Sequence, residues 1–235
     1  MWTMSKEKGT LVVGMTDFAP MDYKAEGSDE WIGFDADMAK AFAESLGVEV
    51  EFQEINWDSK VLELENKGVD VVWNGMTLTD DVKALMATSE PYCLNGQVVV
   101  LACRQWPTSI RPWRACPGCS FAVENGSAGM EQAEAAGLDY VAMDTQAKAL
   151  MEVASGTSDA AIIDLLMAGA MIGEGTSYPD LTYTVQLNSE EYGVGFRKGS
   201  DLAEAFNNFW KEAYDAGTVM ETAKTYGVQE SVIEK

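Results

Sequence analysis

The feature that most constrains the fold of this chain is the regular alternation of short apolar runs with amphipathic segments near its N-terminus. The apolar run LVVGM at 11–15 predicts a buried strand. In the segment GFDADMAKAFAESLG, Phe34, Met38 and Phe42 recur at helical spacing, and Gly47 is a typical helix end. Residues 48–52 then alternate like a second strand. A strand–helix–strand order of this kind predicts a parallel sheet covered by helices.

The rest of the chain continues the pattern. Further strands are predicted at 69–73, 97–102, 120–123, 140–143, 160–163 and 194–197, and helices at 58–67, 80–86, 129–136, 145–154, 201–216 and 219–226. A length of 235 residues fits one large domain or two lobes. We therefore predict an α/β protein of two lobes, with mostly parallel sheets flanked by helices. The first lobe comprises 1–100 and 189–235, and the second comprises 101–188.

Charge and composition exclude several functions. The formal net charge is −22, which repels phosphate backbones and anionic lipid headgroups, so nucleic acid is not an expected partner. The chain has no histidine, which excludes Ser-His-Asp and Cys-His nucleophile activation and His-ligated zinc. We predict no cofactor, no metal site and no catalytic residue.

Segments that would report the cellular location are few. No stretch approaches the roughly 20 consecutive apolar residues that span a bilayer, and the start MWTMSKEKGT lacks the apolar core of a secretory signal. Either the protein is cytosolic, or a signal was removed when this chain was defined. Cys93 stands apart from Cys103, Cys116 and Cys119, so the cysteines leave the redox compartment open.

The window 103–119 differs from the rest of the chain. Its sequence, CRQWPTSIRPWRACPGC, is rich in Arg, Pro, Trp and Cys and contains no acidic residue. It reads like a frame-shifted stretch bracketed by two compensating changes, and a native Pro- and Trp-rich surface loop is the alternative. The Cys-Pro-Gly-Cys spacing within it matches a redox motif, but no strand–helix unit is predicted around it. Neither interpretation favours a functional site there.

Candidate binding residues follow the predicted strands, because open parallel sheets bind ligands at the carboxyl ends of their strands. The set combines aromatic rings, hydroxyl and amide groups, glycine-rich helix starts and carboxylates, which suits a small zwitterion: helix N-termini and hydroxyls bind a carboxylate, an acid binds an ammonium group, and rings hold the apolar part. The candidates are Asp17, Phe18, Trp57, Asn74, Gly75, Met76, Thr77, Gly126, Ser127, Ala128 and Asp164.

Each candidate also has a structural interpretation. Phe18 and Trp57 could be core residues, Asn74–Gly75 an ordinary turn, and Ser127 only a helix cap. Asp164 ends the apolar strand AAIID, where an unpaired charge is costly, so it is the strongest candidate for ligand binding.

Several motifs along the chain resemble those of a known protein family. GFDADMAKAF at 33–42 resembles the signature of the family 3 extracellular solute-binding proteins, the polar-amino-acid receptors of ABC importers. In order along about residues 9–228, the same resemblance includes LVVGMTDFAPM, GVDVVWNGMTLT, SEPY, VENGSAG, TSDAAIID and EEYGVGFRKGSDL. It implies two lobes joined by two crossing strands, near 97–102 and 184–190, that close on the ligand like a hinged trap.

The resemblance also implies roles for the candidates. Phe18 and Trp57 match ligand-stacking sites; Asn74, Gly75 and Thr77 match polar contacts of the first lobe. Ser127 matches the carboxylate-binding turn and Asp164 the ammonium-binding acid. One departure is that Val82 stands where the family has a carboxylate-binding arginine. Either another donor replaces that arginine, or the ligand is an amine without a carboxylate.

The function implied is an extracytoplasmic binding protein for a small amino acid or related ammonium compound. Its expected partner is the membrane permease of an ABC importer, and we expect a monomer, lipid-anchored in its full-length precursor. Two alternatives stay open: an enzyme of the cyclohexadienyl dehydratase type on the same scaffold, with Asp164 or Glu124 as acid, and a sensory domain excised from a receptor.

Overall fold

The computed structural model describes residues 8–102 and 118–234, and the window 103–117 lies outside the described residues, as do Cys103 and Cys116. The chain divides into two compact units. Unit 1 comprises the chain up to Leu94 together with Glu190–Lys235, and unit 2 comprises Asn95–Ser189. The sequence-based boundary placed 95–100 and Ser189 in the first lobe. The structure assigns these residues to unit 2, where the stretch 97–100 pairs with two strands.

Unit 1 contains a six-stranded sheet of order β4-β1-β5-β13-β6, with β7 paired to β13. The strands are β1 (Thr10–Met15), β4 (Glu49–Glu54), β5 (Val71–Thr77), β6 (Ala87–Thr88), β7 (Cys93–Asn95) and β13 (Glu190–Phe196), and a separate hairpin pairs β2 (Tyr23–Lys24) with β3 (Trp31–Ile32). β1 pairs in parallel with β4 and β5, whereas β13 is antiparallel to β5.

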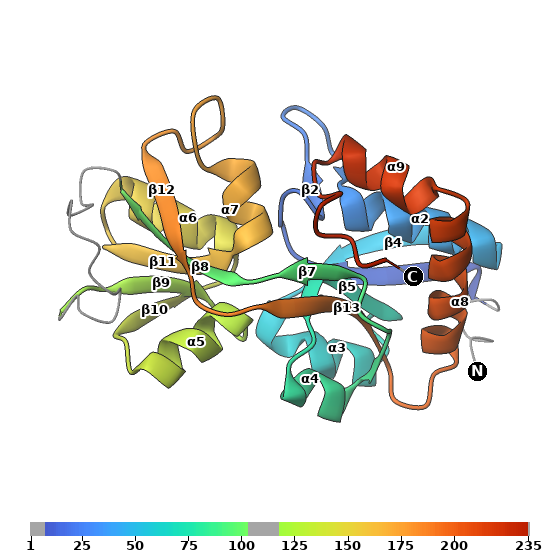
Figure 1. Ribbon diagram of the computed structural model, residues 1–235. Helices are drawn as coiled ribbons and strands as arrows, with labels where there is room; N and C mark the ends of the chain where they lie inside the picture. The colour runs from blue at the N-terminus through green and yellow to red at the C-terminus, as the bar shows by residue number, and fades with distance from the viewer. Residues whose placement is uncertain (1–7, 103–117, 235) are drawn as a thin grey trace. The chain divides into compact units, whose positions relative to one another are not determined.

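Helices cover both faces of the unit 1 sheet (Figure 1). They are α2 (Phe34–Leu46), the 3-10 turn η1 (Trp57–Ser59), α3 (Lys60–Glu65), α4 (Asp80–Leu85), α8 (Leu202–Asp215) and α9 (Thr218–Thr225). On one face, Trp73 of β5 packs edge-on against Phe206 of α8, with ring centroids 4.9 Å apart. On the other face, Val72 belongs to an apolar cluster with Trp57 and Val82. Successive residues of β5 therefore supply the two halves of the core.

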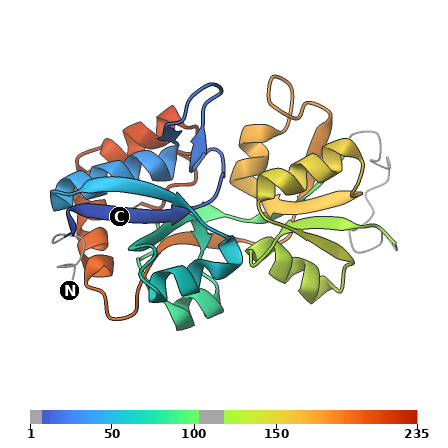
Figure 2. The same ribbon diagram turned by 180° about the vertical axis from the view of Figure 1, so that it is seen from behind.

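Unit 2 contains a five-stranded sheet of order β10-β9-β11-β8-β12. Its strands are β8 (Gln97–Ala102), β9 (Phe121–Glu124), β10 (Tyr140–Met143), β11 (Ala160–Asp164) and β12 (Leu181–Gln186), and its helices are α5 (Ala128–Ala136), α6 (Gln146–Ser155) and α7 (Leu165–Met171). β9, β10 and β11 are parallel, and β8 and β12 are antiparallel neighbours. From behind, α5 and α6 lie on opposite faces of this sheet (Figure 2).

The observed elements differ from the predicted ones in length and number. The helix predicted at 58–67 is a 3-10 turn followed by a short α-helix. β5 continues to Thr77 because Met76 and Thr77 pair with Gly193 and Tyr192 of β13. The strands β2, β3, β6 and β7 were not predicted. The crossing strand that the resemblance implied near 184–190 overlaps the end of β12 and the start of β13. In the described part of the chain, no helix is long and apolar enough to cross a membrane.

Candidate functional site

In unit 1, the predicted site residues follow the carboxyl ends of β1, β4 and β5. Asn74 joins two of these ends. Its side-chain oxygen accepts hydrogen bonds from the amide (3.0 Å) and hydroxyl (2.8 Å) of Thr16, and its nitrogen donates to the Thr16 carbonyl (3.0 Å) and to Asp22 Oδ2 (2.7 Å). Both N–H groups and both oxygen lone pairs are used. The amide therefore fixes the end of β1 against the end of β5.

Gly75 and Phe18 lie in direct contact beside this amide. Gly75 has φ +53°, in the left-handed region, and a Cβ there would lie 2.4 Å from Phe18 Cε1. Phe18 is 3% exposed and packs edge-on against Tyr192, with ring centroids 6.4 Å apart. Its backbone exchanges hydrogen bonds of 2.7 and 2.9 Å with Asp22. The ring position is therefore set by both the loop and the glycine.

Trp57 packs inward. Trp57 is 7% exposed and belongs, together with Val82, to the apolar cluster on the Val72 face of the sheet. The ammonium group of Lys60 lies 5.0 Å from the Trp57 ring centroid and donates to the Trp57 carbonyl (3.1 Å). Lys60, which the sequence analysis missed, is a buried cation at the carboxyl end of β4. The sequence signal that could have identified Lys60 is its position three residues after Trp57, just beyond the predicted strand 48–52.

The other predicted residues of unit 1 have different surroundings. Met76 is 1% exposed within the apolar cluster, and Asp17 is exposed. The Thr77 hydroxyl donates to Glu190 Oε1 over 2.9 Å. Val82 is buried in the first turn of α4, so its position places an apolar group where the family resemblance implied an arginine.

Two buried carboxyl groups, which the sequence analysis did not single out, lie behind this edge. Asp35 Oδ2 accepts from the Gly75 amide and from the Tyr92 hydroxyl, both over 2.7 Å. Burial raises the pKa of Asp35 to about 6, and these donors limit the rise. The pKa of Asp22 is raised well above its usual value by burial and then by the charge of Asp35. Asp35 belongs to the GFDAD motif, which was the available signal.

In unit 2, Gly126, Ser127 and Ala128 form the turn from β9 into α5. Ser127 is the N-cap of α5: its hydroxyl accepts from the Met130 amide over 3.1 Å. Ser127 is 5% exposed and Gly126 has φ +69°. Ala128 is the first residue of α5. The helix N-terminus thus directs its first amide groups to the carboxyl edge of the sheet, where an anion is stabilised.

Asp164 ends β11 at the same edge of unit 2. It is 4% exposed, and amide side chains surround its carboxylate: Gln97 Nε2 donates to Oδ1 over 2.7 Å, Asn95 also donates to Oδ1, and Gln146 donates to Oδ2. The Asp164 amide donates in turn to Gln146 Oε1 (2.9 Å). Asn95 and Gln97 lie two residues apart, whereas Gln146 comes from a distant segment, and no local pattern predicts that all three meet at Asp164.

The register explains why these groups meet. β9 and β11 are parallel, with Ala161 opposite Ala122, so Asp164 falls level with the residue that follows β9. Gln97 is paired with Asp164 across β8 and β11. Gly129 closes the arrangement, because a Cβ there would lie 2.9 Å from the Ile162 carbonyl oxygen and 3.0 Å from Gln97 Oε1. The start of α5 therefore packs directly on β11.

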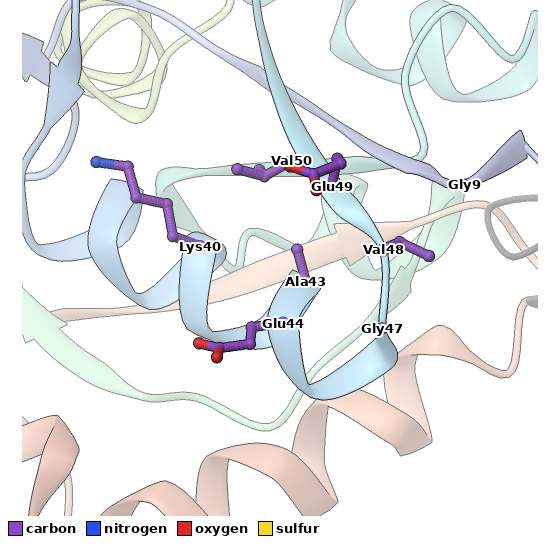
Figure 3. A pocket seen from close by; sticks show the side chains of 8 residues that line it. All are labelled: Gly9, Lys40, Ala43, Glu44, Gly47, Val48, Glu49 and Val50. Atoms are coloured by element: carbon purple, nitrogen blue, oxygen red, sulfur yellow. The ribbon is translucent and has the colours of Figure 1, made fainter.

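The pocket drawn in Figure 3 is at the other edge of unit 1. It is lined by Gly9, Lys40, Ala43, Glu44, Gly47, Val48, Glu49 and Val50. These residues surround the end of α2 and the amino ends of β1 and β4. It is therefore separate from the candidate site. Within the described ranges, no group of three acidic, histidine or cysteine residues could hold a metal ion.

Two α/β units, each with polar groups at the carboxyl ends of its strands and glycine at a crowded strand or helix end, define a two-lobed solute-binding protein. The chain belongs to the bacterial extracellular solute-binding proteins, family 3, whose model matches residues 11–229. The family and the fold predicted from the sequence are thereby confirmed.

Named relatives and a solved structure agree with this membership. The chain is 31% identical to the arginine-binding extracellular protein ArtP of Bacillus subtilis, over 93% of this chain and 86% of that protein. It is 28% identical to the L-cystine-binding protein TcyJ of Escherichia coli K12, over 91% and 81% respectively. The crystal structure of a mutant ArgBP from T. maritima matches with a TM-score of 0.87 and 31% identity, over 95% of this chain and 97% of that chain.

Proposed function

We propose that this protein is the amino-acid receptor of an ABC importer, working outside the cytoplasmic membrane and delivering its ligand to a membrane permease. The observation that carries the proposal is the setting of Asp164. This carboxylate is 4% exposed, and three amide side chains orient it by hydrogen bonds at the carboxyl edge of the sheet. A ligand ammonium group supplies the opposite charge. The named relatives, which bind arginine and cystine, support an amino-acid ligand.

The ligand's carboxylate needs its own partners. We assign the N-terminal turn of α5, with Ser127, as one of them, because first-turn amides stabilise an anion. The cation that replaces the arginine is Lys60, held against Trp57 at the end of β4. Phe18 and Trp57 contribute the apolar walls, and Asp17, Gly75 and Thr77 contribute the remaining contacts of unit 1. Asn74 and Met76 support this edge from within the unit, Asn74 by fixing the strand ends and Met76 from the apolar cluster.

In this proposal each unit supplies one half of the ligand contacts. Binding shifts the population from open to closed forms by the difference in ligand affinity between them, and the closed form docks on the permease. The protein acts as a monomer, and no chemical step is assigned to it.

A thermal-shift screen tests the proposal. Protein unfolded, stripped and refolded is screened against the twenty amino acids, polyamines, quaternary amines and arogenate. A ligand that binds only the folded state at 100 times its Kd adds about 2.7 kcal/mol of stability. A shift with one or a few amino acids supports the receptor. A shift with amines only would reassign the ligand to a cation without a carboxylate, turnover of arogenate would indicate an enzyme, and no shift would overturn the proposal.

The variant Lys60→Met sharpens the screen. It keeps the length and packing of the side chain and removes its charge. Affinity for the amino acid found in the screen is expected to fall, while affinity for the corresponding decarboxylated amine is unchanged. The control is Lys67→Met, because Lys67 is exposed in the turn after α3. Equal losses for the amino acid and the amine would show that Lys60 does not bind the carboxylate.

A further inference from the structure

Asp22 and Asp35 form an unusual pair in unit 1. Both residues are 0% exposed. Each carboxyl group binds one of two consecutive residues of β5: Asp22 accepts from the side chain of Asn74, and Asp35 accepts from the amide of Gly75. The two acids come from different elements, since Asp22 closes the loop after β1 and Asp35 lies in the first turn of α2.

The pair connects the loop, the helix and the strand end. The amides of Asp35 and Ala36 donate to the Met21 carbonyl over 3.0 and 3.2 Å, so the start of α2 is docked on the loop. The loop in turn holds Phe18 through its backbone bonds to Asp22. A movement of either carboxyl group is therefore transmitted to Phe18 and Gly75, two residues of the candidate site.

Each carboxyl group also has one oxygen left over. Asp22 Oδ1 and Asp35 Oδ1 are buried and have no hydrogen bond of normal geometry with the described residues. The Trp73 side chain of β5 lies close enough to Asp35 to lower its pKa as a hydrogen-bond donor, but it carries no charge. The titratable groups that face the pair are Tyr92, Cys93 and Asp37, none of which is a cation. The nearby ammonium group of Lys40 pairs with Asp37 and Glu30. No described cation faces the pair, and two buried negative charges that lack a neighbouring cation are too costly to persist together.

We infer that Asp22 and Asp35 are positioning residues that hold one proton between them at neutral pH, and that this proton keeps Phe18, Asn74 and Gly75 in their ligand-binding arrangement. The proton resides on Asp22 Oδ1, and the charge resides on Asp35, where the Gly75 amide and the Tyr92 hydroxyl stabilise it. The consequence for ligand binding rests on the proposed function; the shared proton does not.

The electrostatic environment agrees with this assignment. The charge of Asp35 is the second cause, after burial, that raises the pKa of Asp22. Asp35 ionises first as the pH rises, because its pKa is about 6 and its hydrogen-bond donors favour the charged form. At a higher pH the second proton leaves, two charges then repel one another, and the loop and strand end separate.

The first test needs no ligand. Hydrogen-exchange NMR measures the protection factor of the Gly75 amide between pH 6 and 9.5, and ¹³Cγ shifts of labelled aspartate report the protonation of the pair. In wild type we expect one buried carboxyl group to titrate above pH 7, with a fall in Gly75 protection of about tenfold as it does so. In Asp22→Asn, whose side-chain amide imitates the protonated acid, protection should not change with pH.

Asp70→Asn is the matched control. Asp70 is also a buried carboxylate that accepts a backbone hydrogen bond, from Val12 over 2.9 Å, but it lies at the amino end of β5. This variant should retain the wild-type pH profile at Gly75. If Asp22→Asn does not fold, the wild-type carbon titration decides alone. The inference is overturned if both carboxyl groups titrate below pH 6, or if the pH profile persists in Asp22→Asn.

The second test addresses the ligand. Affinity for L-arginine and for L-cystine is measured across the same pH range in wild type, Asp22→Asn and Asp70→Asn. Wild type and Asp70→Asn should lose affinity as Gly75 loses protection, and Asp22→Asn should not. If no amino acid of the thermal-shift screen binds any variant while the first test succeeds, the shared proton stands and the proposed amino-acid ligand fails. Unchanged wild-type affinity across the transition would overturn the positioning role.

Discussion

Both units bury carboxyl groups near the carboxyl ends of their strands, and these groups have different surroundings in the two units. In unit 1, Asp22 and Asp35 are directed at their own backbone and each other, at 0% exposure. In unit 2, Asp164 is held by three amides at the end of β11. In the inference above, the carboxyl pair stabilises its own unit by retaining a proton, whereas in the proposed function the carboxylate among amides binds the ligand. The comparison therefore predicts that one group shapes the site and the other contacts the ligand.

The opposite edges of the two sheets provide an internal reference. Asp70 precedes β5 and accepts from the Val12 amide over 2.9 Å, and Asp159 precedes β11 and accepts from the Ser120 amide over 2.8 Å. Both residues tie adjacent strands at their amino ends. Because they perform the same structural task far from the candidate site, they serve as controls for the acids at the carboxyl ends.

The largest expected effect is on ligand binding by Asp164→Asn. Removing one charge of a buried ion pair costs about 3–5 kcal/mol, so affinity for the amino acid found in the screen should fall by a factor of about 10² to 10³, measured by calorimetry. Asp159→Asn should leave the affinity within about twofold of wild type. Equal affinities in the two variants would assign Asp164 to the same structural role as Asp159.

The next effect is on the stability of unit 1. In Gly75→Ala, the alanine must adopt a left-handed backbone conformation, which costs about 1–2 kcal/mol of stability. Its Cβ would also lie 2.4 Å from Phe18 Cε1, so the Phe18 ring must move, which costs about 1–3 kcal/mol more. The control is Gly47→Ala. Gly47 has φ +71° and open space where a Cβ would be, so this variant measures the cost of the left-handed backbone without any crowding. Chemical denaturation should give the larger loss for Gly75→Ala, and equal losses would contradict the crowding.

The pH dependence of folding is the third test. The pKa of Asp35 is about 6 in the folded protein and 3.8 as its usual value, so between these values the folded state holds more protons. Stability therefore falls as the pH rises through this window, by up to about 3 kcal/mol, and the loss is complete above it. Denaturation of wild type and Asp35→Asn at pH 4.5 and 7.5 checks this. A wild-type slope no steeper than that of the variant would contradict it.

The smallest effect comes from the helix caps of unit 2. Ser127 and Thr145 cap α5 and α6 in the same way, accepting from the amide three residues ahead. Each alanine variant should lose about 1 kcal/mol of stability. Only Ser127→Ala should also weaken amino-acid binding, by a few-fold, which calorimetry would detect. Weakened binding in both variants would show that the effect is transmitted through general destabilisation.

The sequence predicted the parts of the fold that depend on local pattern. The strands 97–102 and 140–143 and the helix starting near residue 80 agree with β8, β10 and α4, because apolar runs and turn residues mark them directly. Short strands such as β6 are defined by pairing with β13 rather than by their own residues. Contacts between distant segments, such as Gln146 with Asp164, have no local signal at all.

In the candidate site, too, residues marked by local sequence pattern were predicted, and residues that depend on contacts between distant segments were not. Asn74, Gly75, Ser127 and Asp164 were found because position after a strand is a local property. Their partners were not found: the hydrogen bond from Gly75 to Asp35 joins residues 40 apart, and the one from Asn74 to Asp22 joins residues 52 apart. The ligand roles of the predicted residues stay predictions until the variants are measured.

The contact between Gly75 and Phe18 limits how this receptor could acquire a new ligand. A Cβ at position 75 would lie 2.4 Å from Phe18 Cε1, so we expect single substitutions there to disturb Phe18 without creating a new specificity. The amides around Asp164 are held differently, since Asn95, Gln97 and Gln146 reach the carboxylate through side chains that another side chain can replace without a left-handed backbone. Directed evolution of ligand preference should therefore accumulate changes in unit 2 while position 75 remains glycine.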